Sequence, residues 1–254
     1  MATTRLRPMS MGEILDASFA LLRHHAGVFF GIAIVCQGAP TALSLFVQFG
    51  GGAAQHFWLY VLGQVLSMFG YLLVTGASIR VVSQAYLGHD PGMADALGFA
   101  LAKLGRTVSA GLAAGILMAL ATLLLIIPGI IVVCGLAVVV QAAVLEPLRG
   151  GVDGVGRSWS LTKGFKWKAF GLYAIVFILF LLFLLGFGVV AAIAASIFRP
   201  LIVPAVIGLG LVFLLLYPFT SCVFTLFYYD LRVRKEAFDL ELLSQHLGIT
   251  AARA

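Results

Sequence analysis

Long apolar runs, separated by short polar stretches, dominate the order of residues along the chain. A helix needs roughly 18 or more apolar residues to cross the hydrocarbon core of a bilayer. The runs do not alternate apolar and polar residues as the strands of a membrane barrel do, so helices are predicted. Six membrane-spanning helices are expected, at residues 26–49, 57–79, 107–127, 129–145, 169–196 and 201–229.

The fourth run is the shortest of the six and follows directly after the third. Only Pro128 and Gly129 mark the junction between them. Proline bends or ends a helix because it has no backbone N–H and its ring clashes with the preceding turn. We therefore expect a tight turn or a kink at this dipeptide.

A segment of mixed polarity precedes each of three pairs of runs. In the first segment, Ser10 and Glu13 have the spacing of a capping box, which satisfies backbone N–H groups at a helix start. Residues 1–25 are expected to hold an amphipathic helix on the membrane surface or against the bundle, with docking of a soluble partner as the alternative. Residues 93–106 and 152–168 repeat this layout, which suggests three units related by duplication or by a shared packing logic.

The composition agrees with a membrane protein. Hydrophobic residues make up 62% of the 254 residues and charged residues 10%, whereas about a quarter of the residues in soluble domains are charged. We expect an all-α, polytopic fold with a single integral membrane domain over residues 1–254. Its parts are the amphipathic N-terminal helix over 1–25, six spans over 26–229 and a cytoplasmic tail over 230–254.

The charged residues predict how the spans are oriented. The chain has a formal net charge of +6, and with six spans 15 of its 16 Lys and Arg residues fall on one face of the membrane. The exception is Arg199, and all ten acids lie on the same face as the 15 bases. Loops rich in Lys and Arg face the cytoplasm, so both termini and the amphipathic interfacial helices are expected on that side.

One charged stretch combines cations with aromatic side chains immediately before the fifth span. Trp settles at the level of the lipid headgroups, and a Lys stem lies along apolar surface while its ammonium group reaches water. We expect a membrane-interface collar here, with a specific lipid-headgroup or phosphate site as the sharper hypothesis. The candidate lipid-headgroup contacts are Arg157, Trp159, Lys163, Lys166, Trp167 and Lys168.

Glu146 is an acid at the end of the fourth span, directly before Pro147. A carboxylate at a span end costs little free energy, so it can stand there alone. The alternative hypothesis is a structural ion pair with Arg80 or Arg149 that fastens the span to the surface helix after it.

The sequence lacks the patterns that carry catalysis or metal binding. Its five His and three Cys residues have no metal-ligand spacing, and Cys36, Cys134 and Cys222 all lie in apolar runs. The glycines of 149–158 lack the preceding strand and the Gly-Lys-Ser/Thr of a phosphate-binding loop. No ionisable residue lies near the centre of a span, which argues against an ion-coupled pump. We expect neither an enzyme nor a cofactor.

The C-terminal residues predict a return to the membrane surface. Tyr228 and Tyr229 are expected at the membrane interface, because tyrosine is enriched there. Asp239 is a plausible cap for a short helix whose leucines lie on one side. This helix is expected to fold back onto the cytoplasmic face, with docking of a partner as the alternative.

Four stretches have a recognisable form: "LRPMSMGEILDASFALLRHH" at 6–25, "IIPGIIV" at 126–132, "LEPLRGGVDGVGRSWSLTKG" at 145–164 followed by "W..FG", and "YYDLRVRKEAFDLELL" at 228–243. They resemble the membrane-domain family associated with glycerophosphoryl diester phosphodiesterases. The resemblance implies a polytopic helical domain in the bacterial cytoplasmic membrane, sometimes fused to a phosphodiesterase domain. The residues after the last run are too few for a catalytic barrel of roughly 250 residues, so the resemblance implies no phosphodiesterase activity here.

The expected function is therefore that of a non-enzymatic membrane module. Its expected partners are inner-leaflet phospholipid and, as an open alternative, a protein partner or a second copy of the chain, but not nucleic acid. A small transporter or lipid-translocating protein is the other hypothesis, favoured by the three-unit layout and by the prolines in the spans. A continuous cavity that reaches the middle of the membrane would distinguish the two.

Overall fold

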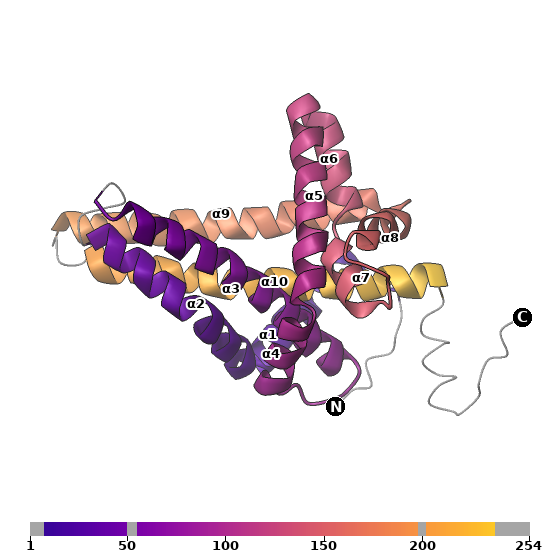
Figure 1. Ribbon diagram of the computed structural model, residues 1–254, viewed down its shortest axis with the longest axis horizontal. Coiled ribbons are helices and arrows are strands. Elements are labelled where there is room, and N and C mark those ends of the chain that lie inside the picture. Colours follow the sequence, from indigo (N-terminus) through magenta and orange to yellow (C-terminus); the bar gives the residue numbers. More distant parts are fainter. Residues whose placement is uncertain (1–7, 50–54, 198–201, 237–254) are drawn as a thin grey trace, which may run out of the picture.

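The computed structural model describes residues 8–49, 55–197 and 202–236, and in residues 48–49, 191, 194–195, 197 and 202–215 it describes the backbone only. Within these residues every regular element is an α-helix, which confirms the all-α prediction (Figure 1). The helices are α1 Met11–His24, α2 Ala26–Phe49, α3 Phe57–Tyr86, α4 Met93–Ala102, α5 Leu104–Leu124, α6 Ile126–Gly135, α7 Val139–Leu145, α8 Asp153–Thr162, α9 Lys166–Ile197 and α10 Ile202–Glu236. The predicted tail helix after Asp239 lies outside the described residues.

Five segments of the described chain are long and apolar enough to cross a membrane. They are Ala26–Val47, Phe57–Tyr86, Leu104–Leu124, Ile126–Leu145 and Lys166–Val190. Each matches one of the first five predicted spans, and residues 202–229 of the sixth predicted span lie in the 35-residue helix α10. The protein is therefore an all-α, multi-pass membrane protein.

The long helices do not all run in one direction. Helices α9 and α10 lie alongside each other, and the hairpin of α2 and α3 packs against α10. The hairpin of α5 and α6 stands across the direction of α9 and α10 (Figure 1). Its tip is apolar and exposed, with Leu123 at 85% and Ile126 at 74%. The tip turns at Leu125, whose backbone is extended, so the turn predicted at Pro128 and Gly129 comes three residues earlier and Pro128 lies within the first turn of α6.

The C-terminal half of α10 forms the centre of the core. Its side chains from Ser221 to Leu231 are all buried, and α10 contacts α1, α2, α3, α7, α8 and α9. Tyr228 and Tyr229, predicted at the membrane interface, are buried within the protein and do not face lipid, since their exposed fractions are 1% and 4%. Both hydroxyl groups find partners in the protein, as a buried tyrosine requires. Tyr229 shares a hydrogen bond of 2.7 Å with the Ser83 hydroxyl on α3.

The helix of the fourth span is interrupted between α6 and α7, and α8 packs against this interruption. Gly135 is the last residue of α6, and its carbonyl oxygen accepts hydrogen bonds of 3.0 Å from the hydroxyls of Ser158 and Thr162. The Val138 N–H donates to the Ser158 hydroxyl oxygen at 3.3 Å. These bonds satisfy backbone groups that the broken helix leaves without partners. A Cβ at position 135 would clash with the Trp159 ring, so glycine is needed for α8 to approach this closely.

Candidate functional site

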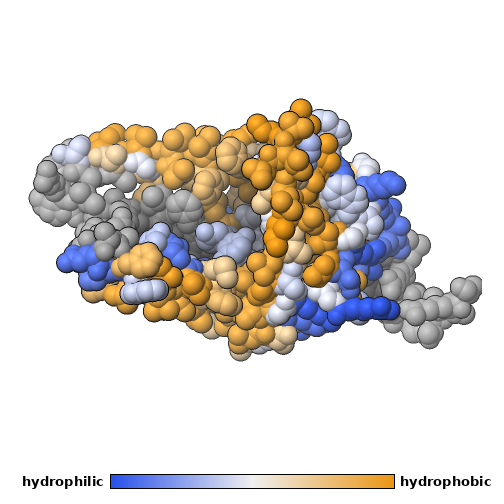
Figure 2. Space-filling model, turned by 45° about the horizontal axis from the view of Figure 1, so that its top comes forward, coloured by the Kyte–Doolittle hydropathy of each residue, from blue (hydrophilic) through white to orange (hydrophobic). Residues whose placement is uncertain are grey.

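Most charged side chains gather where α9 begins and α10 ends, and we call this region the polar end. Figure 2 shows hydrophobic residues over much of the bundle and a large hydrophilic group at its right-hand end. Two networks of charged groups lie at the polar end. One is centred on Asp230 and the other on Glu146.

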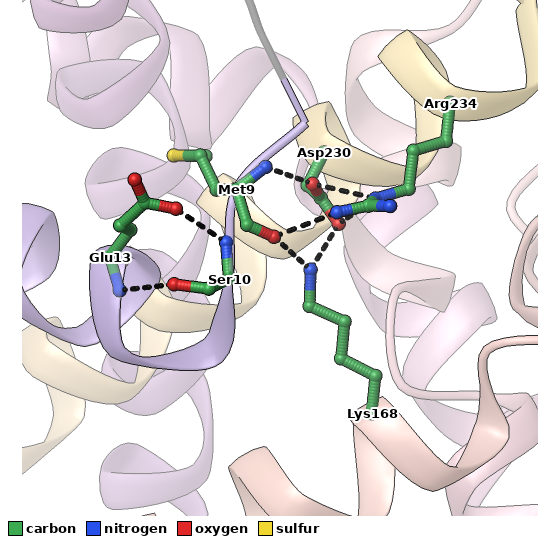
Figure 3. A network of polar contacts seen from close by, with 6 residues as sticks. All are labelled: Met9, Ser10, Glu13, Lys168, Asp230 and Arg234. Carbon is green, nitrogen blue, oxygen red and sulfur yellow. Dashed lines mark hydrogen bonds and ion pairs between the residues drawn. The ribbon is translucent and has the colours of Figure 1, made fainter.

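The Asp230 carboxylate is fully buried and accepts hydrogen bonds from three directions (Figure 3). The Met9 backbone N–H donates to it at 2.7 Å, the Lys168 ammonium at 2.6 Å, and the Arg234 guanidinium at 3.0 Å. Asp230 and Arg234 are four residues apart on α10, which places them on one face of the helix. Lys168 comes from the first turn of α9, so three separate segments meet at one carboxylate.

The same cations also hold the chain that leads into α1. The Met9 carbonyl oxygen accepts a hydrogen bond of 2.5 Å from Lys168 and one of 2.9 Å from Arg234. Next to it, the Ser10 hydroxyl accepts from the Glu13 N–H, and the Glu13 carboxylate accepts from the Ser10 N–H, which confirms the predicted capping box (Figure 3). The start of α1 is thereby fixed to the ends of α9 and α10.

Replacing Asp230 should destabilise the whole bundle. Asp230→Asn leaves two cations without a countercharge in a buried site, and breaking a buried ion pair typically costs about 3–5 kcal/mol. We expect the free energy of unfolding, measured in mixed detergent micelles, to fall by that order. The control is Asp16→Asn, because Asp16 is exposed on α1. Equal stability of the two variants would show that the Asp230 network contributes nothing.

Glu146 is the centre of the second network. Its carboxylate accepts a hydrogen bond of 2.6 Å from Arg157 Nε and one of 2.9 Å from the Tyr228 hydroxyl. Its backbone carbonyl accepts from Arg106 at 3.3 Å. The end of α7 is thus joined to α5, α8 and α10.

Arg157 also pairs with a second acid on α10. Its Nη2 atom lies 2.5 Å from the Glu236 carboxylate, which in turn accepts a hydrogen bond of 2.9 Å from Arg232. Burial alone would raise the pKa of Glu236, but the hydrogen bonds from Arg232 and Arg157 outweigh it and hold that pKa below its usual value. For Arg157, burial lowers the pKa and the two carboxylates raise it above the usual value. Both groups are charged at neutral pH.

The partner predicted for Glu146 needs correction. Glu146 pairs with Arg157, and not with Arg80 or Arg149. The chain reverses after Pro147, so that α8 packs against α7 and brings Arg157 back over the end of the span. Arg80 pairs with Asp95 of α4 at 2.9 Å, and its hydrogen bond is the main reason that the pKa of Asp95 lies below the usual value. The predicted role, fastening the span to the surface helix, agrees with the contacts found.

Double-mutant cycles test this assignment. Glu146→Gln and Arg157→Gln should couple by about 1–3 kcal/mol in the free energy of unfolding, because the two side chains share a hydrogen-bonded ion pair. The matched cycles of Glu146→Gln with Arg149→Gln and with Arg80→Gln should show coupling within experimental error. Coupling of Glu146 to Arg149 or Arg80 of the same size would contradict the structure.

The structure divides the six candidate lipid-headgroup residues into two groups. Arg157 and Lys168 turn inward and belong to the two networks described above. The other four lie at the surface, and we call them the collar: Trp159, Lys163, Lys166 and Trp167.

The collar surrounds the start of α9. The Lys166 ammonium lies 3.4 Å from the centre of the Trp159 ring, within the range of a cation–π contact. Lys163 is exposed, and Trp167 is 84% exposed, with its ring edge-on to Phe170. Phe170 is also exposed, and it lies two residues after Lys168, where the apolar part of α9 begins. The collar therefore combines positive charge with large aromatic surface at the boundary between polar and apolar residues.

The sequence reasoning missed a groove between α5 and α8. It is open, has a volume of about 740 Å³, and falls within the size range of small-molecule sites. The groove is lined by Ala113, Ile116, Leu117, Val152, Asp153, Val155, Gly156, Arg157 and Ser160. The spacing of Asp153, Arg157 and Ser160 on one helical face could have signalled it.

Within the described residues, no three His, Cys, Asp or Glu side chains come together as a metal site would need. The bundle and its polar end define a multi-pass, all-α membrane protein with charged networks at one end of its helices. Comparison with protein-family models, with curated proteins and with solved structures found no match.

Proposed function

We propose that the protein is a non-enzymatic module of the bacterial cytoplasmic membrane that binds inner-leaflet phospholipid through its collar. The observation that carries this proposal is the exposure of Trp167, Lys163 and Trp159, with the half-buried Lys166 against the Trp159 ring. Aromatic rings at this level contact the glycerol region of the lipid, and lysine ammonium groups attract its phosphate. Arg157 and Lys168, the two candidate cations outside the collar, form ion pairs inside the protein with Glu146 and Asp230.

The orientation proposed for the polar end follows from its charge. An excess of Lys and Arg marks the cytoplasmic side of a membrane protein. The hairpin of α5 with α6 and α7 returns the chain to its starting side, so the proposed placement of both termini on one side does not depend on whether that hairpin crosses the bilayer. The amphipathic helices α1, α4 and α8 then lie at the inner leaflet. The resemblance to the membrane-domain family is consistent with this proposal.

Neutralising the collar lysines tests the proposed function. Each cation near an anionic membrane surface contributes about 1 kcal/mol, so Lys163→Gln with Lys166→Gln should weaken binding of phosphatidylglycerol by roughly ten- to thirtyfold. The measurement is native mass spectrometry of the purified protein titrated with that lipid. The control is Arg23→Gln with Lys103→Gln, which removes two cations from outside the collar.

Lys168 is left unchanged in this experiment because it binds Asp230 and its loss would confuse unfolding with loss of lipid. Equal lipid retention by the collar variant and the control would contradict the proposal. The collar would then serve only to position α9. A second polypeptide retained in place of lipid would point to a scaffold whose activity belongs to its partner.

A further inference from the structure

The groove between α5 and α8 has walls of different polarity. On the α5 side the lining is entirely apolar, and Ile116 is 59% exposed and Leu117 42% exposed. The α8 side carries Asp153, Arg157 and Ser160. Because the first of these walls belongs to an apolar membrane helix and the other to the polar end, the groove is suited to an amphiphile and not to a purely polar ligand.

The hollow in the α8 wall exists because residue 156 has no side chain. A Cβ built on Gly156 would have no atom within 4 Å, so the space in front of it is open. Asp153 lies nearly one helical turn before Gly156 and Ser160 slightly more than one turn after it. Asp153 and Ser160 are therefore separated by about 10 Å along the helix axis.

The polar groups beside the groove carry both signs of charge. The Arg157 guanidinium is already neutralised by Glu146 and Glu236. Lys235 does not line the groove, but its ammonium lies 2.5 Å from the carbonyl oxygen of Ser160, the lining residue nearest the C-terminal end of α8, and brings a cation to that end of the helix. The Asp153 carboxylate, whose one modest contact is a hydrogen bond of 3.1 Å from the Gly150 N–H, supplies negative charge at the other end.

This pattern points to one class of ligand. We propose that the groove between α5 and α8 binds a single zwitterionic phospholipid with an ethanolamine headgroup. Its ammonium group faces Asp153, its phosphate lies toward Ser160 and Lys235, and an acyl chain follows Ile116 and Leu117 on α5. Separated charges of opposite sign match such a headgroup better than an anionic one, which Asp153 would repel.

The inference rests on the proposed binding of phospholipid but names a different site. The collar residue Trp159 faces Gly135 of α6, whereas the groove residues face α5. Lys163 and Lys166 of the collar follow the last residue of α8 and do not line the groove, so the two sites can be disabled separately.

Filling the groove tests the inference. Gly156→Leu places a side chain in the hollow without a clash at its Cβ, and leucine favours a helix more than glycine does, so α8 should stay folded. The matched control is Gly98→Leu, since Gly98 lies exposed within α4 and its Cβ also meets nothing within 4 Å.

The proteins are reconstituted in bilayers of equal phosphatidylethanolamine and phosphatidylglycerol, and native mass spectrometry identifies the retained lipid. The wild type and Gly98→Leu should each retain one phosphatidylethanolamine. In Gly156→Leu this retention should fall at least about tenfold, because a Leu side chain occupies the volume of the ligand. Asp153→Asn should remove most of the preference for phosphatidylethanolamine over phosphatidylglycerol.

Equal retention by Gly156→Leu and the wild type would overturn the inference while leaving the collar proposal intact. So would a wild type whose phosphatidylglycerol, and not its phosphatidylethanolamine, is lost in Gly156→Leu, or a dimer that Gly156→Leu dissociates. The variant with Lys163→Gln and Lys166→Gln should keep its phosphatidylethanolamine. A wild type that retains no lipid at all would defeat both proposals.

Discussion

The burial of the Asp230 carboxylate is the constraint on which the rest of the structure depends. A charge without water must be matched by countercharge and hydrogen bonds, or the fold loses several kcal/mol. Lys168, Arg234 and the Met9 backbone provide this match, and they come from the start of α9, the end of α10 and the chain before α1. Because all three must meet at one carboxylate, the polar end can adopt only a narrow range of arrangements.

Polar contacts from the last turns of α10 also fix the neighbouring helices α7 and α8. Tyr228 binds Glu146 at the end of α7, and Glu236 binds Arg157 of α8. Helix α8 is thereby held over the break between α6 and α7 and beside α5, where it forms one wall of the groove. Internal ion pairs thus position α8, and its outer faces are left to contact lipid under the proposals made above.

Hydropathy and local spacing predicted much of this molecule. The apolar runs gave the helices, and Ser10 with Glu13 gave the start of α1, because both depend on residues close together in sequence. The partner of Glu146 could not be predicted, since it depends on how the chain reverses after Pro147. Hydropathy also cannot distinguish a helix face that meets lipid from one that meets protein, so the burial of Tyr228 was missed. The groove could not be predicted because its two walls, α5 and α8, are far apart in the sequence. The transporter hypothesis stays a prediction.

The central claim is that the polar end faces the cytoplasm, and accessibility of single cysteines tests it most directly. Lys163→Cys and Gln55→Cys are made with the three native cysteines replaced by alanine, and a membrane-impermeant maleimide is applied to intact cells and to inverted vesicles. Both positions are exposed, one at the polar end and the other between α2 and α3. The account predicts labelling of Lys163→Cys only in inverted vesicles and of Gln55→Cys only in intact cells. Labelling of both from the same side, or of Lys163→Cys from outside, would contradict it.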